Sequence, residues 1–274
     1  MREISDSPGT PRSDREVVER IARRGPALVA LSGGVDSSLV AALAVEAVGA
    51  AALAVTLSGP AVAATEVERA RRVARAVGIE HHVVPIDPLA RREYRENSPN
   101  RCYFCRSVET EVLRREGALR GVRQYLDGVH LDDLSDERPG LRAMDEAGFD
   151  HPLLWAAWAK VDVRRAAKER GLPNWDQPSD ACLSSRIAHG VPVSAELLGR
   201  IERGEAWVTA RGFRRVRVRT HGLDARVEVD PDEVARLRAE PLVSELRVAL
   251  GAIGFSHVEV DPRGYGVHRT GAAP

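Results

Sequence analysis

The residues best suited to chemistry lie in a glycine- and serine-rich segment, SGGVDSS, at positions 32–38. An apolar run typical of a buried strand precedes this segment, and small apolar residues with helical spacing follow it. Glycines let a phosphate approach the backbone, and the helix that follows presents free N–H groups and the positive end of its dipole. Ser37 and Ser38 add hydroxyl donors, and Asp36 is placed to hold Mg²⁺ or to orient the loop. An ordinary strand-to-helix turn with an N-cap is the alternative interpretation.

This loop lacks the lysine of the common phosphate-binding P-loop. Its residues resemble the PP-loop of ATP pyrophosphatases, enzymes that cleave ATP between the α and β phosphates and leave AMP on a substrate. The resemblance implies that the loop holds the departing pyrophosphate, so no lysine is needed to follow the γ-phosphate. It predicts ATP contacts from Ser32, Gly33, Gly34, Asp36, Ser37 and Ser38. Lys160, which precedes the segment VDVR, is a further candidate for a contact with the ATP phosphates.

Three cysteines are too few for a disulfide framework, and in a reducing compartment they indicate a metal or catalysis. Cys102 and Cys105 form a C-x-x-C pair, which we place in a loop, and Cys182 lies in the polar segment ACLSSR. Such a pair with a third thiol suits a tetrahedral metal or an iron–sulfur cluster. A zinc site, a reversible disulfide and two spectator thiols are the alternatives. Arg186 could lower the pKa of the Cys182 thiol, whereas a buried structural thiol is the competing interpretation.

Three further segments indicate one particular family among the PP-loop enzymes: NRCYFCR, DGVHLDDLSDERPGLRAMDEAG and GLPNWDQPSDACLSSRI. Together with the PP-loop they resemble the LarE family, ATP-dependent sulfur transferases of nickel-pincer nucleotide cofactor synthesis. The resemblance covers the chain from about residue 15 to residue 265. Two places depart from the family pattern. Residues 127–130 read DGVH where family members tend to read D-G-T-N, and the C-terminal segment RGYGVHRTG differs from a G-Y-R-x-G-S type of ending.

The resemblance implies that ATP adenylates a ring carboxylate of a pyridinium nucleotide and that sulfur then displaces AMP. It places Cys182 at the centre, with Arg186 beside it and Glu202 as a metal ligand or base. The sulfur comes from Cys182 itself, which becomes dehydroalanine, or from a sulfide on a four-iron four-sulfur cluster. We favour the cluster, held by Cys102, Cys105 and Cys182. A surface helix glutamate is the alternative for Glu202.

The resemblance adds two further groups of residues. Asp127 and Gly128 are expected to contact ATP. The segment RRVRVRT, read as a strand, sends Arg215, Arg217 and Arg219 to one face. The family pattern favours Arg217 and Arg219 as a clamp for the substrate phosphate, because guanidinium groups match phosphate oxygens. A solvated strand face is the alternative. Trp155 and Trp158 are expected to pack rather than to stack on a base.

The elements that must position these residues alternate along the chain. Apolar runs at 27–31, 51–57, 81–86 and 124–129 read as strands, and segments at 15–24, 37–48 and 65–78 read as helices. This alternation predicts an α/β fold, a doubly wound parallel sheet with ligands at the carboxyl ends of its strands. After about residue 194 a helix, a strand pair around a turn at 221–222, two helical segments and a strand at 257–260 indicate a small α+β domain. We predict a disordered arm at 1–14, a PP-loop domain at 15–190 and the small domain at 191–274.

Composition limits the partners. Forty basic and forty acidic side chains cancel, which argues against a broad surface for nucleic acid or membrane. The N-terminus lacks the apolar core of a signal peptide, and no apolar run could span a bilayer. We expect a cytoplasmic homo-oligomer that uses ATP, Mg²⁺ and a pyridinium nucleotide, with no nucleic-acid or membrane partner. A PP-loop enzyme that thiolates tRNA and a non-catalytic ATP-binding iron–sulfur sensor are the rival functions. An amidotransferase synthetase is disfavoured because no region of glutaminase size is present.

Overall fold

The computed structural model describes residues 13–134, 139–178 and 180–266 of the chain. Outside the described residues lie most of the predicted arm at 1–14, part of the DDLSDERPG segment and the last residues of RGYGVHRTG. Helix α1 already begins at Asp14, the last residue of the predicted arm. The chain divides into two compact units, which we call the first unit (1–88 and 100–180) and the second unit (89–99 and 181–274). In the described part of the chain, no helix has the length and apolar character to cross a membrane.

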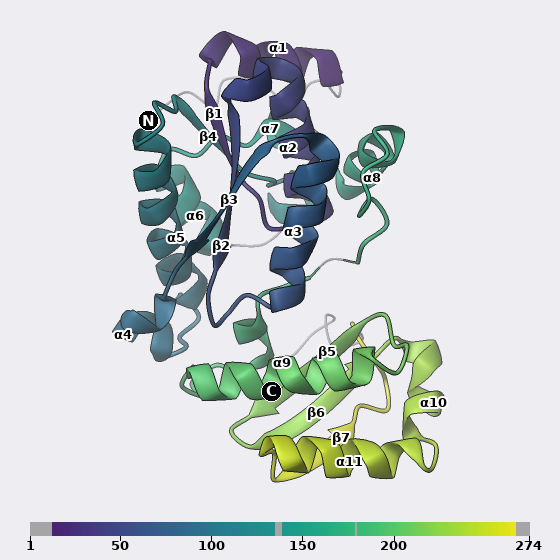
Figure 1. The fold of residues 1–274 in the computed structure, drawn as a ribbon. Coiled ribbons are helices and arrows are strands. Elements are labelled where there is room, and N and C mark those ends of the chain that lie inside the picture. The colour runs from purple at the N-terminus through teal and green to yellow at the C-terminus, as the bar shows by residue number, and fades with distance from the viewer. Residues whose placement is uncertain (1–12, 135–138, 179, 267–274) are drawn as a thin grey trace. The chain divides into compact units, whose positions relative to one another are not determined.

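The first unit is built on a parallel sheet, as the alternation of elements predicts. Its strands lie in the order β3 (Glu80–Pro85), β2 (Ala52–Ser58), β1 (Ala27–Ala30) and β4 (Gln124–Leu126) (Figure 1). All neighbouring pairs run parallel. The chain steps from β1 outward to β2 and β3, and β4 then pairs with the other side of β1. The point where the strand order reverses therefore lies between the carboxyl ends of β1 and β4, which is where open α/β sheets bind ligands.

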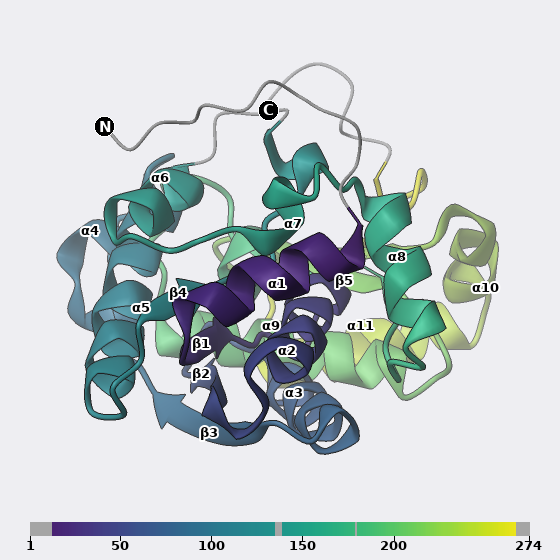
Figure 2. The same ribbon diagram turned by 90° about the horizontal axis from the view of Figure 1, so that it is seen from above.

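Helices cover both faces of this sheet, and this explains why its strands read as continuous apolar runs. The helices on one face are α1 (Asp14–Arg24), α2 (Val35–Val48), α3 (Ala64–Val77) and α8 (Lys160–Glu169), and those on the other are α5 (Arg101–Ala118) and α6 (Pro139–Glu146) (Figures 1 and 2). Ala27 and Val29 of β1 pack in the α2 cluster, while Leu28 between them packs with Leu113 of α5. The short helix α7 (Pro152–Trp155) adds the buried Leu153.

The second unit is a small α+β arrangement. Strands β5 (Val216–His221) and β6 (Asp224–Val229) form an antiparallel hairpin, and β7 (His257–Val260) pairs parallel to β6. Its helices are α4 (Arg92–Arg95), α9 (Ala195–Thr209), α10 (Val234–Arg238) and α11 (Leu242–Ile253). Fully buried residues from these elements form the core, among them Leu198, Ile201, Val218, Val227, Leu246 and Leu250. The α/β class and the α+β character of the C-terminal part are thus as predicted.

Candidate functional site

The SGGVDSS loop follows β1 directly and turns into α2 at the strand-order reversal. Gly33 has a φ of +81°, and a Cβ there would lie 2.8 Å from the Glu66 carbonyl oxygen, so the position requires glycine. The Ser32 backbone N–H donates to Ser37 Oγ at 3.1 Å, and Ser38 Oγ donates to the Gly34 carbonyl at 2.7 Å. Both hydroxyls therefore stabilise the loop from within, and the N-terminus of α2 carries the backbone donors suited to phosphate.

Asn174, which the sequence did not single out, holds this loop from outside. Its Nδ2 donates to the Gly33 carbonyl at 2.8 Å and to Ser38 Oγ at 2.9 Å. The side chain is buried, and its Oδ1 has no hydrogen-bond partner among the described residues. Asn174 lies in the segment GLPNW, and a polar residue beside Pro173 and Trp175 gives no signal that it will be buried. Its place follows only from the fold.

A partly buried histidine, His81, helps to fix the end of the strand that enters the loop. Thr56 Oγ1 donates to the Leu31 carbonyl at 2.6 Å, and His81 Nε2 lies 2.8 Å from the same Oγ1. Burial, and then the positive charge of Arg71, lowers the pKa of His81. Because the hydroxyl has one proton and gives it to Leu31, His81 Nε2 must be the donor to Thr56. This chain of hydrogen bonds sets the direction in which the backbone leaves β1.

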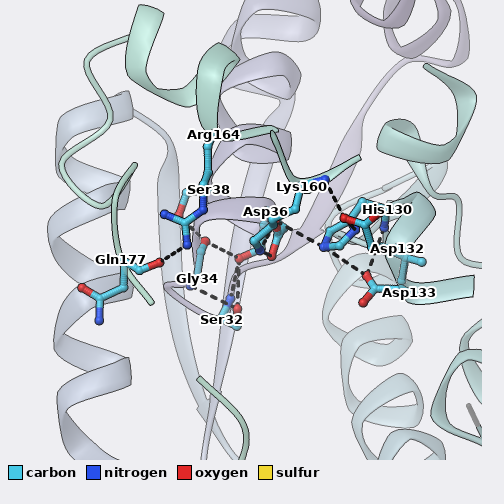
Figure 3. A network of polar contacts seen from close by, with 12 residues as sticks. Ser32, Gly34, Asp36, Ser38, His130, Asp132, Asp133, Lys160, Arg164 and Gln177 are labelled. Carbon is cyan, nitrogen blue, oxygen red and sulfur yellow. Dashed lines mark hydrogen bonds and ion pairs between the residues drawn. The ribbon is translucent and has the colours of Figure 1, made fainter. Parts of the chain in front are cut away.

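Asp36, in the first turn of α2, is the centre of a charged network beside the loop (Figure 3). Lys160 Nζ, from the start of α8, lies 2.6 Å from each carboxylate oxygen of Asp36. On the other side His130 Nε2 is 3.8 Å from Asp36 Oδ1 and 3.6 Å from Asp133 Oδ2. The Lys160 backbone N–H donates to Asp132 Oδ2 at 2.9 Å. Lys160 thus contacts Asp36 in this structure, whereas the sequence suggested only a contact with ATP phosphate.

Asp127 and Gly128 follow β4, so they lie on the second strand of the reversal point. A Cβ on Gly128 would lie 2.6 Å from the Ser37 backbone nitrogen, so the β4 turn packs tightly against the first turn of α2. Asp127 Oδ1 accepts hydrogen bonds from His151 Nδ1 at 2.7 Å and from the Val129 N–H at 3.1 Å. The other oxygen, Oδ2, is buried and has no hydrogen-bond partner among the described residues.

His151 is a second residue that sequence reasoning missed. It bridges two carboxylates, because its Nε2 also lies 2.8 Å from Asp145 Oδ1. Burial alone would lower the pKa of His151, but its hydrogen bonds to Asp127 and Asp145, and their negative charges, raise the pKa to about 9. At neutral pH the imidazole is therefore protonated and donates from both nitrogens. It ties the end of β4 to α6 through its contacts with Asp127 and Asp145.

The C-x-x-C pair lies in a helix and not in the loop that we predicted. Helix α5 begins at Arg101, and the N–H of Tyr103 donates to the carbonyl of its N-cap residue Asn100 at 2.9 Å. Cys102 and Cys105 therefore stand one helical turn apart at the start of α5, with Cys102 exposed. Cys105 Sγ lies 3.2 Å from Glu109 Oε1. The described residues contain no group of three or more His, Cys, Asp or Glu side chains arranged to hold a metal ion.

Cys182 belongs to the second unit, at the start of a short 3₁₀ turn, Leu183–Arg186. Arg186 is buried in a bidentate pair with Glu205 of α9, at 2.8 Å for Nε and 3.0 Å for Nη2. Its Nη1 also donates to the carbonyls of Ala181 and Cys182. Glu205 in turn accepts a hydrogen bond from the Val218 N–H of β5 at 3.0 Å. Arg186 thus fastens the cysteine segment to α9 and β5.

Glu205 of α9 contacts Arg186, and sequence reasoning, which named Glu202 in the same helix, did not single it out. The two lie three residues apart, so they share one side of the helix. Glu202 is partly buried, and its role as the acidic group near the sulfur-transfer site stays a prediction. Both glutamates stand in the segment GRIERGEAW, and the sequence pattern alone does not show that Glu205 will contact Arg186.

The three arginines named for the predicted phosphate clamp lie in different surroundings, and their role stays a prediction. Arg217 is buried, donates from Nη1 to the Val216 carbonyl at 2.7 Å and lies with its Cζ 5.3 Å from the centre of the Tyr265 ring. Arg219 is 37% exposed and pairs through Nε with Glu228 Oε1 at 2.6 Å. Its Nη1 lies 3.4 Å from the Ser185 carbonyl oxygen, which brings it to the cysteine segment. Arg215 precedes β5 and therefore lies outside the strand in which we predicted it.

Similarity to known proteins places the chain in a family. Residues 15–114 match the family model described as NAD synthase. With the parallel sheet and the SGGVDSS loop at its reversal point, this match defines a PP-loop ATP pyrophosphatase domain. The chain is 31% identical over 240 residues to the pyridinium-3,5-bisthiocarboxylic acid mononucleotide synthase of Lactiplantibacillus plantarum, covering 86% of each chain. It belongs to the LarE family of ATP-dependent sulfur transferases, which confirms the predicted family and enzyme class.

Two further relatives place the chain within the wider group. An uncharacterized protein of Synechocystis sp. is 38% identical over 239 residues, covering 87% of this chain and 89% of that protein. The tRNA-specific 2-thiouridylase MnmA of Xanthobacter autotrophicus is 31% identical over 219 residues, covering 65% of this chain and 53% of that enzyme. Similarity to the tRNA-modifying enzymes is therefore limited to a smaller part of each chain than similarity to the mononucleotide synthase.

Proposed function

We propose that this enzyme adenylates a carboxylate of a pyridinium dicarboxylate mononucleotide and converts it into a thiocarboxylate, in nickel-pincer nucleotide cofactor synthesis. The observation that carries the proposal is the match to the L. plantarum mononucleotide synthase over 86% of the chain, which extends through both units. The PP-loop at the strand-order reversal supports the adenylation half of the reaction. The arginines beside the Cys182 segment support recognition of a substrate phosphate.

In the first step a carboxylate oxygen of the substrate attacks the α-phosphorus of ATP, and pyrophosphate leaves with the electrons of the broken P–O bond. We assign phosphate binding to the loop through Ser32, Gly33, Gly34, Ser37 and Ser38, with Asp127 and Gly128 completing the ATP site. The partly exposed carboxylate of Asp36 suits Mg²⁺, which prefers oxygen ligands and substrate phosphates. Mg²⁺ supplies positive charge to the phosphates when it is bound.

In the second step sulfur attacks the acyl carbonyl and AMP leaves. We assign this step to Cys182, with Arg186 shaping its segment and Glu202 as the acidic group of α9. If Cys182 is the donor, its thiolate forms a thioester. Removal of the Cα proton then breaks the Cβ–Sγ bond, which leaves a thiocarboxylate on the substrate and dehydroalanine on the enzyme.

We favour a second source of sulfur, a four-iron four-sulfur cluster held by Cys102, Cys105 and Cys182. Two thiols one helical turn apart on α5 fit the spacing of two cluster ligands, and a third cysteine is present in the second unit. Such a cluster would supply a transferable sulfide at the iron that lacks a protein ligand. In both cases the Cys182 segment brings sulfur to the adenylated carboxylate, whereas Cys102 and Cys105 are needed only if the cluster is the donor.

The test is an anaerobic assay with ATP, Mg²⁺ and the pyridinium dicarboxylate mononucleotide. We expect AMP and pyrophosphate in equal amounts, and a product in which sulfur replaces oxygen, detected by mass spectrometry. Unmodified tRNA, supplied in place of the mononucleotide, should yield no AMP. AMP formation that depends on tRNA would favour the tRNA-thiolating function, and ATP binding without turnover on either substrate would favour the sensor.

Intact-mass measurement of the spent enzyme separates the two sulfur sources. With a cluster, Cys102→Ser or Cys105→Ser should abolish the visible absorption and repeated sulfur transfer while AMP formation continues. With sacrifice of Cys182, both variants should still deliver up to one sulfur per chain, and the chain should lose the mass of hydrogen sulfide at residue 182. An unchanged mass with more than one sulfur delivered per chain excludes sacrifice, and dehydroalanine at residue 182 excludes the cluster donor.

A further inference from the structure

The carboxylate of Asp36 is occupied by a cation of the protein itself. Lys160 Nζ lies 2.6 Å from Oδ1 and 2.6 Å from Oδ2, so one ammonium group contacts both oxygens (Figure 3). The two side chains are 23% and 24% exposed, which leaves the pair partly shielded from solvent. The position of Lys160 is fixed at its backbone as well, because its N–H donates to Asp132 Oδ2 at the first residue of α8.

This arrangement conflicts with metal binding at the same carboxylate. A divalent cation and an ammonium group cannot both contact the two oxygens of Asp36, because they would repel each other at contact distance in a partly shielded site. His130 Nε2 also approaches the same carboxylate, to 3.8 Å, so the space around Asp36 is already filled by side chains of the protein. Mg²⁺ must therefore displace Lys160 Nζ. The displaced ammonium then needs another anion.

ATP supplies that anion. The N-terminus of α2, which carries the phosphate-binding donors, begins at Val35, one residue before Asp36. Phosphate oxygens bound there could accept a hydrogen bond from Lys160 Nζ, while the Asp36 carboxylate binds Mg²⁺. Asp132 and Asp133 are the nearby acidic alternatives, but Asp132 already accepts the Lys160 backbone N–H and Asp133 Oδ2 already accepts the His130 N–H at 3.1 Å.

We propose that Lys160 is a positioning residue that closes Asp36 to metal until ATP is present, so that metal and nucleotide bind together rather than one after the other. The proposal rests on the ATP site assigned above. The two affinities are linked by thermodynamics: the factor by which ATP raises the affinity for metal equals the factor by which metal raises the affinity for ATP. Lys160 contributes to this mutual increase in affinity, because its ammonium group leaves Asp36 favourably only when a phosphate oxygen can bind it.

The experiment measures binding without turnover. Mn²⁺ serves as the metal probe, with the free ion counted by electron paramagnetic resonance, and α,β-methylene-ATP serves as the nucleotide because the bond to be cleaved is blocked. In Lys160→Met the affinity for Mn²⁺ alone should rise about tenfold, equivalent to about 1.4 kcal/mol, because the competing ammonium is gone. The factor by which the nucleotide raises Mn²⁺ affinity should fall by a similar amount. Asp36→Asn should lose at least tenfold in Mn²⁺ affinity.

Two variants control for other causes. Lys168 is the remaining lysine of the chain, and its Nζ lies 4.7 Å from the centre of the Trp175 ring. Lys168→Met removes the same charge and should leave both affinities unchanged. Lys160→Arg keeps a cation beside Asp36 and should bind Mn²⁺ as weakly as the wild type does. If Lys160→Met destabilises the fold, Lys160→Gln replaces it in the same comparison.

The outcomes are distinct from those of the function assay, because no sulfur acceptor is used. Mn²⁺ affinity in Lys160→Met that stays at or below the wild-type value overturns the inference, even in an enzyme that forms AMP with the mononucleotide. Retained Mn²⁺ affinity in Asp36→Asn overturns it too, because the metal then binds elsewhere. Conversely, a wild-type enzyme that shows the coupling but forms no AMP contradicts the proposed function and leaves the role of Lys160 standing.

Discussion

A single added methyl group at Gly128 should both destabilise the fold and weaken ATP binding. A Cβ at Gly128 would lie 2.6 Å from the Ser37 nitrogen, 2.8 Å from the Asp36 carbonyl carbon and 2.9 Å from Asp36 Cβ. Two of these three atoms are backbone atoms in the first turn of α2, so no side-chain rotation can relieve the contact. In Gly128→Ala the turn after β4 and the start of α2 must therefore move apart.

The magnitude follows from the nature of the contact. Forcing an extra methyl group into a packed interior costs about 1–3 kcal/mol of unfolding free energy. We expect the upper part of this range, because α2 is anchored by an almost entirely buried face and cannot shift without disturbing β1 and α8. The same shift moves the backbone N–H groups of the loop, so the Michaelis constant for ATP should rise and AMP formation should fall.

Urea denaturation and steady-state AMP formation measure the two effects. Gly251→Ala is the matched control, because Gly251 lies inside helix α11 and a Cβ there would meet nothing within 4 Å. That variant should be neutral or more stable by about 0.5–1 kcal/mol, since alanine replaces glycine in a helix. Wild-type stability and wild-type turnover in Gly128→Ala would show that the tight contact between β4 and α2 is not needed for ATP binding.

Three further predictions address the other charged residues. Asp36→Ala should abolish AMP formation while circular dichroism stays unchanged, and normal AMP production would remove Asp36 from the ATP site. Arg217→Ala or Arg219→Ala should weaken binding of the mononucleotide by about 1.5–3 kcal/mol and leave ATP binding nearly unchanged; equal losses for both ligands would indicate a folding defect. Because the folded pKa of His151 is raised to about 9, its stabilising contribution is complete below about pH 6.5 and is lost as the pH rises through 9. Urea titrations of His151→Gln should therefore show a stability deficit at pH 6 that shrinks by pH 9.5, and a deficit independent of pH would contradict the ionic role of His151.

Local sequence signals were sufficient for the fold of the first unit. Alternating apolar strands and amphipathic helices carry their own period, and turn residues mark their ends. Helix α3, for example, ends at Gly78, which has the left-handed φ of 75° that a helix C-terminus favours. The position of the PP-loop at the carboxyl end of β1 follows from the same signals, because a parallel sheet brings the loops after its strands to one edge.

Contacts across long stretches of chain could not be predicted in this way. Asn174 reaches Gly33 across 141 residues, and Lys160 reaches Asp36 across 124 residues. Neither pair shares a helix face or a strand register, so no periodicity connects them. The prediction of a loop for the C-x-x-C segment was wrong for a different reason, because its cysteines suggested a ligand-binding loop. The segment from Arg101 to Ala118 contains no proline and only one glycine near its end, so it forms a continuous helix.

Two arginines contact the cysteine segment of the second unit, and they differ in their exposure to solvent. Arg186 pairs with Glu205, and its Nη1 donates to the Ala181 and Cys182 carbonyls and to Ser185 Oγ. A buried bidentate pair of this kind is costly to separate, because either partner would be left as an uncompensated charge. Arg219 also pairs with a carboxylate, Glu228, at 2.6 Å, but its side chain is 37% exposed and its Nη1 reaches the Ser185 carbonyl only at 3.4 Å. We therefore expect an anionic group that arrives near Cys182 to gain more from the exposed Arg219 than from Arg186, to which we assign the role of holding the cysteine segment in place.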